Sequence, residues 1–484
     1  MNLDRWRLLF NRIAKQPRRL AVVIFGLHQL LVIYLLTQHE LWRDELQAWS
    51  IAKASTSPLD VIRNTQFEGR PPLWQLVLWP LTRISDNPNT MKFVTFAIGT
   101  AAMWLWIRST ALPLALRTLI AFGFLFTGGY FGHSREYILM LLLLLFAIQA
   151  TNIDPLSKTS TLLMCLLSGV NLFGLVMAAA LVLATVIKPS VQQLWPPFNR
   201  ATLATSARLC ILTATFALSA YWIYPKPESQ FGVGTYIGWQ RPLVNAIFPF
   251  VANVESNQTT WAILAISTLC ALAIGIFTTS RTGCVYLVSA CVVLSLNASF
   301  GFAFYWWHWG AVAIVAVTSP LVKTRNDPPR NIAYFAIIPL VFIACAGLLA
   351  NWKGPGELVY GQTPYSMSQI TAEQLKDICQ PDCTIIVDWD ATGAAISSHM
   401  GGKSLYYLNR QEFGTFALFV RTNVSPTWEQ AISTMQQFDR PILVTTDLLI
   451  GVLPNGLEMV GAPWGGVWDN ALILQLASKP IKSQ

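Results

Sequence analysis

Long apolar segments, separated by short stretches that carry most of the charge, are the dominant pattern along this chain. A segment of about 20 apolar residues has the length of a helix that crosses the hydrocarbon core of a bilayer. We therefore expect a polytopic α-helical membrane protein with about eleven transmembrane helices, several of them shorter than this length. The expected spans are residues 20–38, 91–107, 118–131, 137–150, 159–172, 173–187, 209–224, 260–279, 283–299, 304–322 and 331–350.

Basic residues give these spans an orientation. Several Arg and Lys side chains precede the first span, and cytoplasmic segments carry an excess of such residues. Assigning the other basic stretches to cytoplasmic turns places the N-terminus inside and the C-terminus outside. These stretches are 108–117, Lys158, 188–208, Arg281 and 323–330. A cleaved signal peptide is disfavoured, because no small-residue cleavage site follows residue 38.

Residues 39–89 are expected to form one long extracytoplasmic loop that contains short helices at 45–53, 58–64 and 71–83. The last of these is too short to span a bilayer, and Pro80 interrupts it. Its two tryptophans favour an interfacial helix. Loops of this length are usually functional or disordered, and the aromatic content favours an ordered loop.

The pattern changes after residue 350. Helix-like stretches at 366–378, 391–400 and 425–438 alternate with strand-like stretches at 384–389, 403–408 and 441–446. Ser425 and Pro426 fit an N-cap and the first turn of the last helix. We therefore expect two domains: a transmembrane domain over residues 1–350, and an extracytoplasmic α/β domain over residues 351–484.

Composition agrees with this division. Hydrophobic residues make up 54% of the chain and charged residues only 12%, which excludes an ordinary soluble protein. The net charge of +9 follows largely from the cytoplasmic loops, so it requires no nucleic acid partner. Most cysteines lie in or beside apolar spans. Cys379 and Cys383 lie in the expected outer domain, where a disulfide is favoured over half of a metal site because no second Cys/His pair accompanies them.

The most conspicuous candidate for chemistry is the acidic pair Asp44 and Glu45, just past the first span. Two adjacent carboxylates at a membrane boundary are costly, and such groups mark functional sites. The alternative is structural: the pair caps the helix that begins near residue 45 and binds Arg43. We favour the functional interpretation, because capping requires one acid and no Trp-rich loop around it.

Three pieces of sequence together resemble a known family. They are the acidic pair in the first outer loop, the stretch Phe-Glu-Gly-Arg-Pro-Pro-Leu-Trp at 67–74, and the turn Tyr-Phe-Gly-His-Ser-Arg-Glu-Tyr at 130–137. In this order they are similar to the GT-C superfamily of membrane glycosyltransferases. The resemblance is to the bacterial dolichyl-phosphate-mannose-protein mannosyltransferase-like and aminoarabinose-transferase-like branches, and it covers the N-terminal third best.

The resemblance implies an inverting transfer of a sugar from a polyprenyl-phosphate donor to an acceptor outside the cytoplasm. The acceptor would be a cell-envelope glycan, a lipid or a protein, and the location the bacterial inner membrane. It assigns Asp44 as the general base, and Glu45 as a residue that orients Asp44 or helps to hold Mg²⁺ or Mn²⁺. A mechanism without metal stays open, because the acid of the second turn follows the arginine here.

Further substrate-binding candidates surround this pair in the sequence. Arg70, Arg135 and Arg63 are candidates for the leaving phosphate, with interfacial snorkelling as the alternative for Arg63 above all. His133 and Glu136 occupy the second outer turn. His308, a further substrate-binding candidate, lies in an aromatic run that also suits a belt at the lipid headgroups.

One further motif is rejected as a nucleotide-sugar site, and two other functional classes stay open. Asp388 and Asp390 form a DxD motif typical of nucleotide-sugar transferases, but an acid at the end of a strand more often caps the next helix. A transporter or flippase should show charges in mid-span and two matching repeats of broken helices, which are not evident. A non-catalytic scaffold of polysaccharide assembly stays the main alternative.

Overall fold

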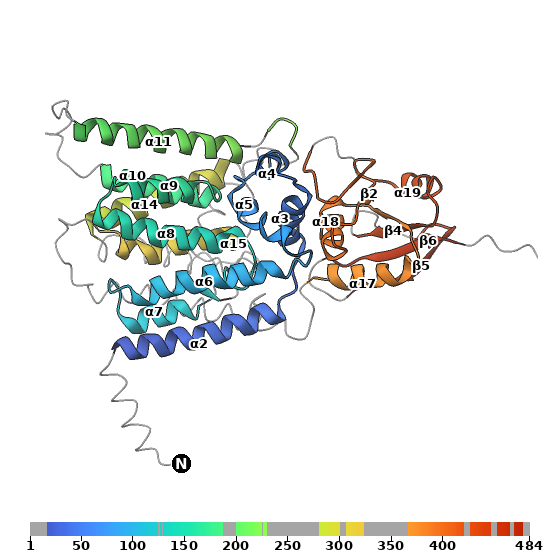
Figure 1. The fold of residues 1–484 in the computed structure, drawn as a ribbon, viewed down its shortest axis with the longest axis horizontal. Helices are drawn as coiled ribbons and strands as arrows, with labels where there is room; N and C mark the ends of the chain where they lie inside the picture. Colours follow the sequence, from blue (N-terminus) through green and yellow to red (C-terminus); the bar gives the residue numbers. More distant parts are fainter. Residues whose placement is uncertain are drawn as a thin grey trace, which may run out of the picture. The chain divides into compact units, whose positions relative to one another are not determined.

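The structure, a computed structural model, describes residues 17–123, 126–127, 129–186, 200–224, 226–229, 280–300, 306–323, 366–420, 426–446, 453–464 and 469–477 (Figure 1). These residues belong to two compact units. The first, here called the helical unit, draws on Met1–Thr37, Val94–Tyr224 and Val233–Val359. The second, here called the α/β unit, draws on Gln38–Phe93, Pro225–Gly232 and Tyr360–Gln484.

The helical unit consists of helices that run beside one another in Figure 1. In the described part of the chain these are α2 (Pro17–Gln38), α6 (Thr90–Arg108), α7 (Leu114–Ala121), α8 (Glu136–Ile153), α9 (Lys158–Ser168), α10 (Leu172–Val186), α11 (Arg200–Ile223), α14 (Arg281–Phe300) and α15 (Trp306–Thr318), which the short 3-10 helix η4 (Ser319–Leu321) follows.

Four of the described helices are long and apolar enough to cross a membrane: Arg18–Gln38, Thr90–Arg108, Glu136–Ile153 and Leu203–Ile223. Leu172–Val186 and Arg281–Leu294 are apolar but shorter. The expected spans 260–279 and 331–350 lie outside the described residues. The expected span 118–131 is wrong as one helix, because α7 ends at Ala121 and Gly123, a poor helix former, follows in a bend.

Apolar side chains on the outer surfaces of these helices fit a membrane protein. Leu27, Leu30 and Tyr34 on α2 and Leu203 and Leu218 on α11 are all more than half exposed. Such contiguous apolar surface is uncommon on soluble monomers. Apolar helices with apolar outer faces therefore support a membrane location for this unit.

The α/β unit begins with the loop that follows α2. It contains α3 (Arg43–Ala54), α4 (Pro58–Asn64), α5 (Leu73–Leu78) and the 3-10 helix η1 (Leu81–Arg83). The helix predicted at 58–64 is confirmed residue for residue: Ser57 accepts a hydrogen bond from Asp60 N, and Pro58 occupies the first turn. The segment predicted as one helix at 71–83 is two short helices that meet at Pro80.

The C-terminal part of the α/β unit is a six-stranded mixed sheet with the order β3-β2-β1-β4-β6-β5. Its strands are β1 (Thr384–Val387), β2 (Leu405–Tyr407), β3 (Glu412–Gly414), β4 (Pro441–Thr445), β5 (Leu457–Gly461) and β6 (Leu472–Leu476). The central strand β1 pairs in parallel with β2 and β4, while β3, β6 and β5 pair antiparallel with their neighbours. Its helices are α17 (Ser368–Ile378), α18 (Asp390–His399) and α19 (Trp428–Met435).

Alternation along the strands builds a core on each face of this sheet. Ile385, Val387 and Val444 belong to one apolar cluster with α17 and α18, and Ile386 and Leu443 belong to another with α19.

A disulfide joins Cys379 at the end of α17 to Cys383, just before β1, as the sequence predicted. An α/β arrangement is thus confirmed for this part of the chain.

One helix start and three strands of the prediction need correction. The helix expected from Ser425 begins at Trp428, because the Thr427 hydroxyl accepts from Gln430 N and thereby caps it. Strands β3, β5 and β6 were missed. Strand β3 pairs with β2 and strand β5 with β6, which are neighbours in the sequence, and β6 joins the sheet through β4. These short sequences form strands because such partners supply the hydrogen bonds.

Residues of the first loop pack into the C-terminal part, which is why Gln38–Phe93 belongs to the α/β unit and not to the helices around it in the sequence. Helix α3 lies against α18, and small residues line both helices at the contact. Ser50 Oγ donates to Ala394 O at 3.1 Å, and Ser398 Oγ donates to Leu46 O at 3.3 Å. Close helix packing and specific hydrogen bonds therefore hold the first loop to the C-terminal α/β part, although the sequence pattern assigned the loop to the transmembrane domain.

Candidate functional site

Helix α3 presents the acidic pair in its first turn. Glu45 is fully buried, and its Oε2 accepts hydrogen bonds from Trp42 N at 3.1 Å and from His39 Nε2 at 2.7 Å. The Trp42 bond satisfies a backbone N–H at the start of the helix, which is half of a capping box. The structural alternative therefore describes Glu45 well.

Asp44 has a different environment. Its side chain is 37% exposed, and Arg43 Nε lies 3.9 Å from its Oδ1. Its carboxylate is close enough to raise the pKa of both Glu68 and Asp469. Of the two adjacent acids, Asp44 is the more exposed one, and Glu45 is the one that caps the helix.

Glu68 and Arg70 form a buried ion pair in the same unit. Arg70 Nη2 lies 3.0 Å from Glu68 Oε2, and both side chains are almost inaccessible. Gly69 between them adopts a φ of 66°, which only glycine reaches without strain, and this turn separates the two charged residues in the sequence. Burial raises the pKa of Glu68, and the guanidinium of Arg70 opposes this shift.

Arg63, the third arginine proposed for the phosphate, is placed differently. Its side chain is 70% exposed on α4, and Nη1 lies 3.8 Å from Asp60 Oδ1 one turn earlier. A surface ion pair of this kind contributes little to stability. The structure thus buries Arg70 beside Glu68, which also bonds to Gln47 of α3, whereas Arg63 lies on the surface.

A second buried acid, Asp469, holds the start of α3. Its Oδ2 accepts from Ser366 Oγ at 2.8 Å and from Arg43 N at 3.3 Å, and the Arg43 guanidinium lies 4.5 Å from the centre of the Trp389 ring. Burial raises the pKa of Asp469, and Arg43 opposes this shift. The first turn of α3 is therefore anchored to residues that follow it by more than 300 positions in the sequence.

The helical unit carries the second predicted group. Arg135 is the N-cap residue of α8, and Glu136 is buried in the first turn of that helix. Arg135 Nε lies 3.6 Å from Glu136 Oε2, and its guanidinium is 5.3 Å from the centre of the Tyr137 ring. Arg135 N donates to His133 O at 2.9 Å. The predicted turn is therefore an ordered helix start with a largely buried ion pair.

His308 lies in helix α15, and its side chain is outside what the structure describes. Most of residues 225–261 also lie outside the described part of the chain. In its described part, Lys226 Nζ lies 5.7 Å from the centre of the Phe67 ring, and Ser229 bridges to Val420.

Both acids of the DxD motif, Asp388 and Asp390, accept hydrogen bonds within the fold, and the expectation that such an acid is the N-cap of the next helix is wrong. Asp388 at the end of β1 accepts from Thr445 Oγ1 at 2.8 Å and from Thr446 N at 2.9 Å, which ties β1 to β4. Asp390 accepts from Leu418 N at 2.9 Å. The N-cap position of α18 is Trp389, whose side chain makes no capping bond.

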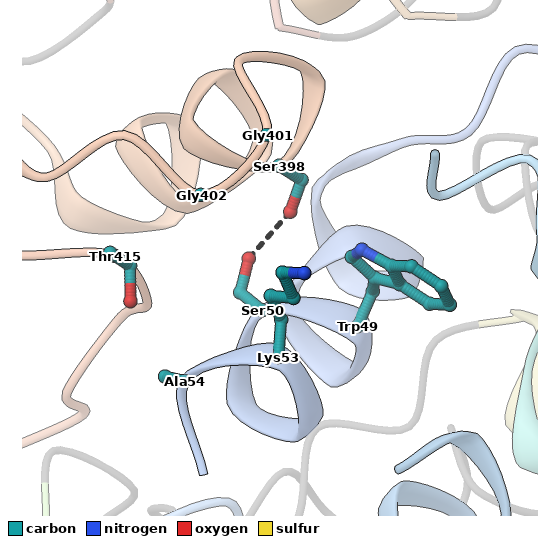
Figure 2. A pocket seen from close by; sticks show the side chains of 8 residues that line it. All are labelled: Trp49, Ser50, Lys53, Ala54, Ser398, Gly401, Gly402 and Thr415. Carbon is teal, nitrogen blue, oxygen red and sulfur yellow. Dashed lines mark hydrogen bonds between the residues drawn. The ribbon is translucent and has the colours of Figure 1, made fainter. Parts of the chain in front are cut away.

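A pocket of about 150 Å³ opens between α3 and α18 (Figure 2). It is lined by Trp49, Ser50, Lys53, Ala54, Ser398, Gly401, Gly402 and Thr415. Figure 2 shows the Ser50 and Ser398 hydroxyls pointing toward one another, and their oxygens are 2.5 Å apart. Lys53 is ion-paired with Asp86, so its charge is already balanced. None of the predicted site residues lines this pocket.

The acids fit a divalent cation only in part. Glu45 Oε2 already accepts from His39 and Trp42, and both Glu68 oxygens accept hydrogen bonds, Oε2 of them from Arg70. Carboxylates held by such donors are weaker ligands for a hard cation than open ones. The metal role of Asp44 and Glu45 therefore stays a prediction.

Comparison with known proteins adds no assignment: no protein-family model, curated protein or solved structure matches this chain.

Proposed function

We propose that this protein is an inverting glycosyltransferase that moves a sugar from a polyprenyl-phosphate donor to an acceptor outside the cytoplasm. The proposal combines the GT-C resemblance with one observation. Asp44, the exposed acid of the pair, lies in the first turn of α3, and Gln47 on the same helix donates to Glu68 Oε1 at 2.8 Å, which connects this helix to the buried Glu68 and Arg70 pair.

The proposed reaction assigns one role to each group. Asp44 accepts the proton of the acceptor hydroxyl while the hydroxyl oxygen attacks the anomeric carbon, and the bond from that carbon to the phosphate oxygen breaks. Arg70 binds the polyprenyl phosphate that leaves, because a guanidinium matches phosphate oxygens well. Glu45 keeps the first turn of α3 in place. Arg135, with His133 and Glu136, is proposed as a second donor-binding group.

The set of chain segments that make up the α/β unit supports the expected topology. Segments that fold together lie on one side of a membrane, and this unit joins Gln38–Phe93, Ser229 and the C-terminal sheet. The chain must then cross the bilayer an even number of times between residues 93 and 226, and again between 229 and 366. The expected spans satisfy both conditions if the segment 118–131, whose helix α7 ends at Ala121, is still counted as one crossing. They then place this unit opposite the N-terminus.

The test of the function is Asp44→Asn in full-length protein in lipid vesicles. The amide keeps the size of the side chain but accepts no proton, so sugar transfer should fall by about 100-fold or more while donor binding is retained. Arg70→Ala and Arg135→Ala should weaken donor binding as well. Radiolabelled transfer and donor binding are measured in parallel.

Asp377→Asn, at an exposed position of α17, is the matched control and should transfer normally. Near-normal transfer by Asp44→Asn would remove Asp44 as the base. Absence of both transfer and binding by the wild type, with every polyprenyl-linked sugar tested, would favour the scaffold or transporter instead.

A further inference from the structure

Gln47, in the middle of α3, links the C-terminal sheet to the Glu68 carboxylate. Its Oε1 accepts from Ala417 N at 2.8 Å, and its Nε2 donates to Ala417 O at 2.9 Å and to Glu68 Oε1 at 2.8 Å. One carboxamide thus pairs with both backbone groups of a single residue and still reaches the acid. All three bonds fix which way the amide points.

Ala417 is itself held firmly by the α/β fold. It follows β3, it is buried, and the next residue donates its N–H to Asp390 at 2.9 Å. Ser229 bridges to Val420 three residues further on. The position of Gln47 is therefore set by the C-terminal part of the unit and not by α3 alone.

Glu68 passes this constraint to Arg70. Its Oε1 accepts from Gln47, and its Oε2 accepts from Arg70 Nη2 at 3.0 Å. A buried carboxylate is tolerated only where such partners compensate for lost hydration. Loss of Gln47 would leave Glu68 Oε1 without this donor, and the carboxylate would then be free to turn away from Arg70.

We infer that Gln47 and Glu68 are positioning residues, through which the C-terminal domain holds the guanidinium of Arg70 ready for the donor phosphate. The inference rests on the proposed function. It gives the C-terminal domain a definite role, which is to organise the phosphate site. The proposed base, Asp44, lies one turn before Gln47 on α3. The chain of contacts is Ala417, Gln47, Glu68 and Arg70, and each contact is a hydrogen bond of 2.8 to 3.0 Å.

The experiment is a double-mutant cycle in the full-length protein. Gln47→Leu removes a hydrogen-bond donor to Glu68, and Glu68→Gln removes the charge that holds Arg70. Each should raise the KM for the polyprenyl-phosphate sugar by about tenfold, with a smaller effect on kcat, because the Arg70 guanidinium is then held less firmly. Arg70→Ala should raise KM further. The KM of the double variant Gln47→Leu, Arg70→Ala should equal that of Arg70→Ala alone, because Gln47 and Glu68 then have no guanidinium to position.

Ser50→Ala is the matched control, because Ser50 also bonds α3 to α18 but takes no part in this chain of contacts. Its KM should be unchanged, which separates positioning from general loosening of the α3–α18 contact. Glu68→Gln with Arg70→Ala provides a second cycle in case Gln47→Leu does not fold.

If the wild type binds donor and transfers sugar, but the effects of the single substitutions add up in the double variants, the positioning role of Gln47 and Glu68 is wrong. The proposed function would then still stand. An unchanged KM in Gln47→Leu and Glu68→Gln would likewise contradict the positioning role and leave the proposed function standing. A wild type that neither binds nor transfers any polyprenyl-linked sugar would overturn the proposed function, and the positioning role with it.

Discussion

The two units use polar groups in opposite ways. In the helical unit many polar side chains bond to backbone carbonyls of nearby helices, as Asn152 does to Leu321 O, and large apolar side chains cover the outer surfaces. In the α/β unit, buried carboxylates accept several hydrogen bonds each: Asp469 accepts from Ser366 Oγ and Arg43 N, and Glu68 accepts from Gln47 and Arg70. The apolar outer surface of the helical unit fits a lipid environment, whereas the α/β unit buries several carboxylates that require polar partners.

The largest expected effect tests whether α2 of the helical unit lies in a membrane. Leu30 on α2 and Leu59 on α4 are 66% and 54% exposed, respectively. Leu30→Arg should destabilise membrane insertion by about 3 kcal/mol, because a charge near the middle of a span is costly. Leu59→Arg should have little effect. The amount of full-length protein in the membrane fraction measures both, and equal accumulation of the two variants would contradict the assignment of α2 as a span.

The next comparison concerns glycine. A Cβ at Gly393 on α18 would overlap the Tyr407 ring and lie 2.7 Å from Val387 Cγ2, whereas one at Gly26 on α2 would meet no atom within 4 Å. Gly393→Ala should destabilise the α/β unit by up to about 3 kcal/mol through overpacking. Gly26→Ala should be neutral or slightly stabilising. Thermal unfolding of the purified protein gives the order, and a lower Tm for Gly26→Ala than for Gly393→Ala would contradict it.

The disulfide tests the α/β unit by itself. Replacing Cys379 and Cys383 together by serine should lower stability by about 2 kcal/mol, because the bond closes only a short loop. Proteolysis of the C-terminal segment should become faster, while sugar transfer is retained. Mass spectrometry of unreduced protein should show the linked peptide, and two free thiols in freshly isolated protein would exclude the bond.

The smallest effect involves His399 at the end of α18. Burial, with Lys376 and Lys92 nearby, lowers the pKa of His399 from 6.5 to about 4. Between these values the unfolded chain binds a proton that the folded chain does not, so stability is lost as the pH falls through this range. His399→Gln should therefore lose less Tm than the wild type between about pH 7 and about pH 5. An equal loss in both proteins would show that His399 does not titrate in this way.

Local pattern was enough for elements that carry their own signals. The Ser57 cap and Pro58 fix α4, and the apolar runs fix α2, α6 and α8 within a few residues. The start of α19 was misplaced because Ser425 and Thr427 are both plausible caps, and only the fold selects one. Glu68 and Asp469 were missed as members of the site. An acid two residues before Arg70 was the available signal for Glu68, but nothing local marks Asp469.

By itself, then, the sequence determined which stretches are apolar enough for a membrane, where an α/β region follows them, and that Asp44 and Glu45 are an unusual pair. Only the tertiary structure decided that the first loop folds with the C-terminal sheet, that Glu45 is buried while Asp44 is open, and that Gln47 joins Ala417 to Glu68. The physical reason is range. Periodicity and capping act over a few residues, whereas burial and the partners of a carboxylate depend on contacts between residues hundreds of positions apart.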